Sequence, residues 1–148
     1  MPAFSDYAES GILNFLFRSN TNSFGAPANV SVALCTDVPS ESQNGTTIPE
    51  VPEGAANGYN RVNLGAPANA DWDESDQVND SGHIQNAAAV TFGAATTAWG
   101  NVSGIALVTN QGWGSGEVLM FGALTTPKDV GAGDTFQFNT GELDLYLG

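Results

Sequence analysis

The alternation of apolar and polar residues is clearest in the last third of the chain, residues 99–147. Such alternation, broken by Gly, Asn and Pro, is typical of half-buried antiparallel strands. Residues 117–124 lack the alternation, which favours a central strand covered on both faces. A turn-rich stretch, 125–134, follows it. We therefore expect a four-strand unit here, formed by residues 102–109, 117–124, 135–139 and 143–147.

The N-terminal region has a different period. Apolar residues at helical spacing predict one helix over residues 6–19, with Ser5 as its N-cap. Residues 12–17 are too apolar to face water on all sides. The helix is expected either to pack on the sheet or plug one end of the fold, or to act as an arm that docks on a neighbouring subunit.

Short strands also account for the middle of the chain. We expect them at 29–37, 59–64, 84–86 and 88–92, with two long exposed connections between them, 38–58 and 65–82. About eight short strands with irregular loops predict a mainly β protein, an antiparallel β-sandwich or jelly roll with one N-terminal α-helix, forming a single domain over residues 1–148. The expected core is Val32, Leu34, Val90, Phe92, Ile105, Leu107, Leu119, Phe121, Phe136, Phe138, Leu143 and Leu145.

The charge of the chain excludes two classes of binding partner. Charged residues make up 13% of the chain, and sixteen acidic residues face three basic ones, Arg18, Arg61 and Lys128, for a net charge of −13. Nucleic-acid binding requires several cations that neutralise phosphates, and an anionic membrane surface requires the same. We therefore expect neither nucleic acid nor membrane as a partner.

Candidate chemistry is sparse. Cys35, the single cysteine, lies in an apolar strand and is expected to be a buried thiol, and His83 is the single histidine. The acidic loop 71–80 opens like a calcium loop, but Asp76 stands where Gly is required and Gly82 where Glu is required. A solvated acidic loop is favoured. We expect no catalytic residue, no metal and no cofactor, and hence no enzyme.

Targeting signals are not visible either. Residues 1–10 contain no Lys or Arg, and the apolar run 12–17 is too short for a signal peptide. No run approaches the length of a membrane span. We expect a protein that is made and folded in the cytoplasm.

Exposed aromatic and apolar residues are the best candidates for partner contact, because such anchors usually dominate interfaces. They come from the N-terminal segment, from the 38–58 loop and from the glycine-rich tip at 112–116, where Trp113 is also a candidate carbohydrate platform. The predicted partner-binding residues are Phe4, Tyr7, Phe15, Phe17, Ile48, Val51 and Trp113.

Several segments carry a family resemblance. They are Ile-Leu-Asn-Phe-Leu-Phe-Arg at 12–18, Pro-Ala-Asn-Val-Ser-Val-Ala-Leu at 27–34, Gly-Tyr-Asn-Arg-Val at 58–62, Asn-Ala-Ala-Ala-Val-Thr-Phe at 86–92, Trp-Gly-Asn-Val at 99–102, Phe-Gly-Ala-Leu-Thr-Thr-Pro-Lys at 121–128, and Gly-Asp-Thr at 133–135 with Phe138. In this order the chain resembles small virion structural proteins of tailed bacteriophages, of the head decoration (cement) or tail-fibre-like kind.

The resemblance implies a non-enzymatic virion protein. The expected role is capsid decoration: binding to the major capsid protein on the outer capsid surface and strengthening the head, as a homo-oligomer and first of all a trimer. The alternative is a tail-fibre or surface-knob module that binds host carbohydrate. High negative charge suits an outer surface and favours decoration.

Overall fold

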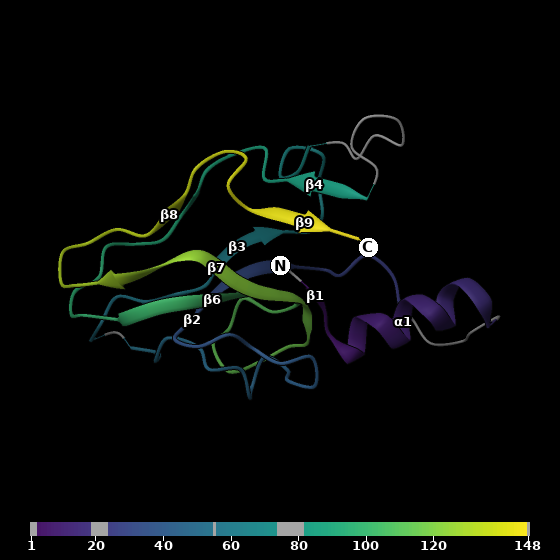
Figure 1. The fold of residues 1–148 in the computed structure, drawn as a ribbon, viewed down its shortest axis with the longest axis horizontal. Coiled ribbons are helices and arrows are strands. Elements are labelled where there is room, and N and C mark those ends of the chain that lie inside the picture. The colour runs from purple at the N-terminus through teal and green to yellow at the C-terminus, as the bar shows by residue number, and fades with distance from the viewer. Residues whose placement is uncertain (1–2, 19–23, 55, 74–81, 148) are drawn as a thin grey trace.

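The structure is a computed structural model, and it describes residues 3–18, 24–54, 56–73 and 82–147. Within these ranges the chain is mainly β with a single helix (Figure 1). The elements are β1 (Ala3–Phe4), α1 (Asp6–Phe17), β2 (Val30–Cys35), β3 (Val62–Gly65), β4 (His83–Gln85), β5 (Val90–Thr91), β6 (Gly100–Val108), β7 (Val118–Val130), β8 (Gln137–Phe138) and β9 (Asp144–Tyr146).

The main sheet has five antiparallel strands in the order β1-β7-β6-β2-β3. β6 is the central strand, paired with β7 on one side and with β2 on the other. All six residues of β2 are buried, so this strand is covered on both faces. The register places Val32 beside Leu107 and Leu34 beside Ile105, which gathers large apolar side chains on one face.

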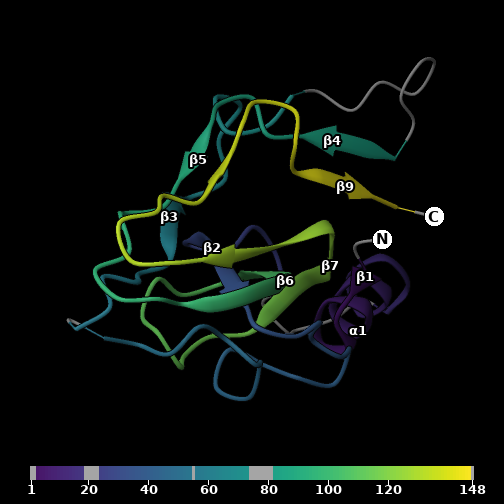
Figure 2. The ribbon, with the colours of Figure 1, turned by 60° about the vertical axis from the view of Figure 1, so that its left-hand side comes forward.

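Two short antiparallel ribbons, β4–β9 and β5–β8, form a second layer over that face (Figure 2). The main hydrophobic core lies between this layer and the sheet, and contains Tyr59, Phe92, Trp99, Phe136 and Phe138. A smaller core on the opposite face of the sheet includes Ala33, Cys35 and Ile48. The predicted fold, mainly β with antiparallel sandwich-like sheets and an N-terminal helix, is confirmed.

Ten of the twelve predicted core residues are buried, and the exceptions are Leu119 and Phe121, which are half-buried. Both lie on β7, which has only the two-residue β1 on its outer side. The prediction that residues 117–124 form a central strand covered on both faces is therefore wrong.

The predicted four-strand C-terminal unit is also wrong. β8 pairs with β5 and β9 with β4, so both strands belong to the second layer. The stretch 125–130, expected to be a turn, continues β7 to Val130, and a register shift between Val102 and Gly104 accommodates it. β1 pairs only with Met120 and Phe121, so the outer side of β7 is unpaired at Pro127, where a proline is tolerated as on an edge strand.

Helix α1 is fixed at its start. The Ser5 hydroxyl accepts a hydrogen bond from the Ala8 backbone N–H at 3.3 Å and donates one to the Val118 carbonyl. The helix packs against β7 and β1 near this end and then projects to one side of the layers (Figure 1). It ends at Phe17, two residues before the predicted end.

Candidate functional site

A buried ion pair organises the long connection after β2. Arg61 Nη2 lies 2.7 Å from Glu50 Oε2, and the two side chains are 0% and 2% exposed. The Tyr59 hydroxyl donates to Glu50 Oε1 at 2.8 Å and accepts from the Leu34 backbone N–H at 2.9 Å. Burial and the adjacent Glu50 carboxylate raise the pKa of Tyr59 above its ordinary value. We refer to Glu50, Tyr59 and Arg61 as the polar hub.

The polar hub also joins distant loops. Arg61 Nη1 donates to the carbonyls of Asn110 and Ser115 at 2.9 and 2.8 Å, and Nη2 donates to the Gly45 carbonyl at 3.1 Å. One guanidinium thereby holds the 38–58 segment against the loop between β6 and β7. The only sign of this role in the sequence is a single cation, Arg61, within a segment whose pattern predicts a strand.

Ile48 and Val51 flank Glu50 and are 7% and 0% exposed. Val51 donates its backbone N–H to the Leu34 carbonyl at 2.9 Å, and Glu50 forms a bridge with Cys35, so this segment lies along β2. The expectation that 38–58 is an exposed loop offering Ile48 and Val51 to a partner is wrong at both positions. Their side chains are taken up by the chain's own core because the polar hub holds the segment there.

The distal half of α1 is the most exposed apolar surface of the described chain. Its large side chains are 58% (Leu13), 65% (Phe15), 61% (Leu16) and 77% (Phe17) exposed. We call these four residues the helix tip. Phe15 and Phe17 thus lie where a partner-binding role requires them, and Leu13 and Leu16, which the prediction omitted, join them.

The other two predicted contact residues of the N-terminal segment are less exposed than the helix tip. Tyr7 is 45% exposed and packs edge-on against Phe24, with ring centroids 6.0 Å apart. Phe4 is half-buried against the main core. The structure therefore places Tyr7 at the base of the helix and Phe4 in the β1 pairing, away from the helix tip.

Trp113 lies in the loop between β6 and β7, at the end of the molecule where the polar hub holds that loop. It is 44% exposed, and its indole Nε1 donates to the Val51 carbonyl at 2.9 Å. The ring is held in place by this bond while part of its surface faces outward. Trp113 therefore remains a candidate contact residue separate from the helix tip.

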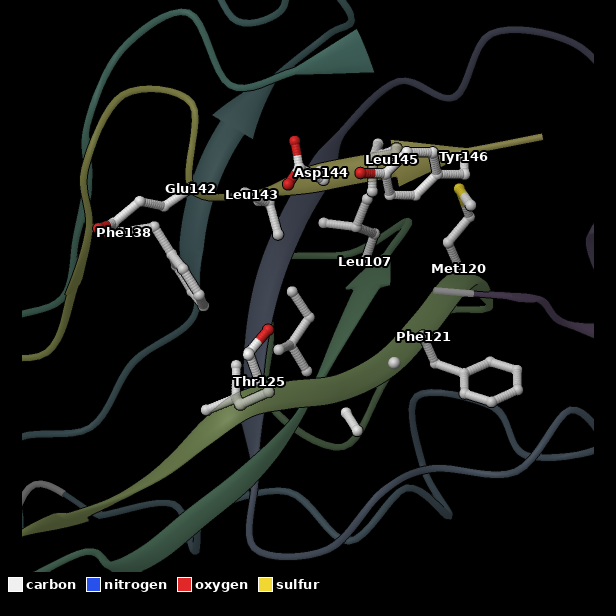
Figure 3. Close-up of a pocket in the computed structure, with 14 residues that line it drawn as sticks. Leu107, Met120, Phe121, Thr125, Phe138, Glu142, Leu143, Asp144, Leu145 and Tyr146 are labelled. Atoms are coloured by element: carbon white, nitrogen blue, oxygen red, sulfur yellow. The ribbon is translucent and has the colours of Figure 1, made fainter. Parts of the chain in front are cut away.

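A groove of about 220 Å³ opens between the main sheet and the C-terminal segment (Figure 3). Its apolar lining comes from β6 and β7 on one side and from the last strands on the other, and includes Leu107, Met120, Leu124, Phe138, Leu143 and Leu145. Sequence reasoning missed this groove, since it depends on β9 crossing over the sheet to pair with β4.

Two acidic residues stand at the rim of the groove. Asp144 Oδ1 lies 3.0 Å from His83 Nε2 and accepts from Gln85 Nε2 at 2.6 Å, and the His83 ring stacks on Tyr146 at 4.5 Å. Glu142 is fully exposed, and the Asn139 backbone N–H that it accepts lowers its pKa. Apolar side chains therefore form the larger part of the groove lining, and the two carboxylates lie beside them.

Reactive groups are scarce in the described residues. Burial, followed by the nearby Glu50 carboxylate, raises the pKa of Cys35 to about 12, so this buried thiol is not a nucleophile near neutral pH. No group of three or more His, Cys, Asp or Glu side chains is placed to hold a metal ion in the part of the chain that the structure covers. Most of the predicted acidic loop, 74–80, lies outside the described residues. No described helix is long and apolar enough to cross a membrane.

Comparison with known families identifies the class of this chain as a bacteriophage virion structural protein. Residues 3–146 match the family described as podophage GP4 fiber I protein gp80, and the chain belongs to this family. The predicted resemblance to small virion structural proteins of tailed bacteriophages is thereby confirmed. Comparison with curated proteins gives no match.

Proposed function

We propose that this chain is a non-enzymatic structural subunit of a phage fibre, which attaches to other virion proteins through its helix tip. The observation that carries the proposal is the exposed apolar helix tip on a chain whose family is described by a fibre protein. Four large exposed apolar side chains gather in the last turns of one helix, and exposed apolar groups gathered in this way are typical of an interface.

The absence of reactive clusters from the described residues supports a structural role over an enzymatic one. Net charge supports protein partners over nucleic acid or anionic lipid, because Arg61 is already used in the polar hub and two other cations remain. We therefore propose a virion protein as the partner, with assembly as a homo-oligomer.

Head decoration is the second candidate. It is favoured by the layered sandwich, which has no internal repeat that would extend it into a shaft, and by the net charge of −13, which suits a surface facing away from packaged DNA. In that role the partner is the major capsid protein on the outer capsid surface, with a trimer as the first expectation.

Locating the chain on purified particles tests both candidates. Antibody labelling seen by electron microscopy should mark fibres if the first proposal holds. Label on the head faces would overturn it and favour decoration, and particles without label would overturn both. Host carbohydrate binding is a separate property of the fibre candidate, and Trp113→Ala should then reduce adsorption to cells without removing the chain from particles.

A further inference from the structure

Two apolar surfaces of this chain lie apart from each other in the same molecule. One is the helix tip and the other is the groove of Figure 3. α1 packs against β7 and β1, and no α1 residue lines the groove. Among the described residues, neither surface therefore covers the other.

The helix tip has apolar residues on both sides of the helix, as a buried helix does. At 100° per residue, Leu13, Leu16 and Phe17 share the outer side of α1, whereas Asp6 and Glu9 occupy that side in the first turn. Phe15 continues the inner side, on which Ala8 is buried. Near its end the helix is thus apolar on both sides, which is typical of a buried helix and favours insertion over contact with a flat surface.

The groove has the size of a receptacle for side chains. Its volume of about 220 Å³ is below the roughly 300–1,000 Å³ of pockets for drug-sized ligands. Leu107 and Leu143, which are buried, form part of its floor, and Leu124 lies nearer the rim. Such a groove accepts a large apolar side chain better than a whole small molecule.

Charge indicates which molecule fills the groove. Arg18 follows Phe17 directly and caps the helix, while Glu142 and Asp144 stand at the groove rim. The C-terminal end of a helix carries partial negative charge, which a carboxylate rim would repel without a cation. Arg18 supplies that cation at the end of the helix tip.

We propose that the helix tip of one copy of this chain enters the groove of a second copy, with Phe17 as the anchor and Arg18 facing Glu142. The contact joins different surfaces of the two copies, so repetition yields a closed ring or an open filament. The inference deepens the proposed function, because it names the contact by which subunits associate.

Sedimentation equilibrium of the full chain over a range of concentrations tests the contact. The native chain should form oligomers. Phe17→Ser should raise the concentration of half-assembly by about tenfold or more, because a central aromatic anchor is lost. Val38→Ser removes an exposed apolar group elsewhere (Val38 is 43% exposed) and should leave assembly unchanged. Equal effects of the two variants, or a native chain that stays monomeric, would overturn the inference.

Charge reversal tests the geometry. Arg18→Glu and Glu142→Arg should each weaken assembly, because each places like charges together at the rim. An equimolar mixture of the two variants should assemble again as alternating copies, since the helix tip of each variant then meets a rim of opposite charge on the other variant. Lys128→Glu makes the same change in net charge as Arg18→Glu and serves as the control. If the mixture behaves like the separate variants, Arg18 does not meet Glu142.

The dependence of association on salt concentration distinguishes a second copy of this chain from a basic partner protein. Two copies with a net charge of −13 each repel at long range, so added salt should strengthen their association as it screens that repulsion. Weaker association in high salt would contradict insertion into a second copy. A monomeric chain that still labels fibres on particles would overturn this inference and leave the proposed function standing.

Discussion

The 38–58 segment is more buried, and helix α1 is more exposed, than their sequences predict. The segment lacks apolar periodicity and has the composition of a loop, yet it contains Glu50 at 8% and Val51 at 0% exposure. The helix has strong apolar character, yet Phe17 is 77% exposed. Burial in this chain therefore depends on where a segment finds partners, and local hydrophobicity alone does not determine it.

The hydrogen bonds that Arg61 donates explain why the 38–58 segment is buried. A guanidinium offers five donors and no acceptor, and Arg61 uses its donors on Glu50 and on three backbone carbonyls. A buried charge is tolerated when it is paired and hydrogen-bonded. Among the described residues, the four side chains of the helix tip remain largely exposed, and we assign their burial to a second copy.

The largest effect is expected from breaking the polar hub. Glu50→Ala leaves the Arg61 charge buried without its carboxylate, and such a loss costs about 3–5 kcal/mol in the free energy of unfolding. Urea denaturation measures it. Glu53→Ala removes an exposed carboxylate from the same segment and should change stability by less than about 0.5 kcal/mol. Similar costs for the two variants would show that the segment is held by something other than the ion pair.

The two faces of the main sheet can be compared in the same way. Phe92→Ala should cost about 3–5 kcal/mol, because Phe92 is 1% exposed and packs against Tyr59 and Phe136. Phe121→Ala should cost about half as much or less, since Phe121 is half-buried beside the short β1. Urea denaturation of both variants checks the order. A larger cost at Phe121 would indicate that β7 is covered more fully than the structure shows.

The pattern of apolar residues was enough to predict the fold class and most of the core. Alternation placed Phe136 and Phe138 inside, and the Ser5 cap located the start of the helix. It could not predict which strands pair, because two-residue strands such as β5 and β8 carry no local signal of their partner. The groove depends on those pairings and therefore could not be predicted from the sequence.

The partner-binding residues could be predicted only in part, because some of them are buried by contacts between distant segments. Phe15 and Phe17 follow from an apolar helix, and their exposure agrees with contact at a partner surface. Ile48 and Val51 were misplaced because the bonds that bury their segment join Arg61 to Gly45, far away in the sequence. Local composition does not indicate a contact of that kind.

A pH-dependent effect of intermediate size is expected beside the polar hub. Burial raises the pKa of Cys35 from 9.0 to about 12, so above pH 9.0 the unfolded chain loses this proton while the folded chain keeps it. Stability should then fall with rising pH by at most about 1.4 kcal/mol per unit between these values, with no contribution below them. Tyr59, whose pKa is also raised, adds to the loss above pH 10.0.

Urea denaturation between about pH 8 and pH 10 measures this slope, in the range where Cys35 titrates in the unfolded chain ahead of Tyr59. Cys35→Ala should lower stability below pH 9.0 because it leaves a small cavity, and it should flatten the slope above that pH, so the difference from the native chain shrinks as the pH rises. An unchanged slope in the variant would assign the pH dependence to another group.

The smallest effect concerns the base of the helix, where the exposed tip depends on a buried cap. Ser5 is 0% exposed, and its hydroxyl serves both the Ala8 N–H and the Val118 carbonyl. Ser5→Ala removes both bonds and should cost about 0.5–2 kcal/mol in urea denaturation. Ser10→Ala makes the same substitution at an exposed position inside α1, where Ala is the better helix former, and should be neutral or slightly stabilising. If the two variants are equally stable, the first turn of α1 is held mainly by β1, and Ser5 does not control how the helix tip is presented.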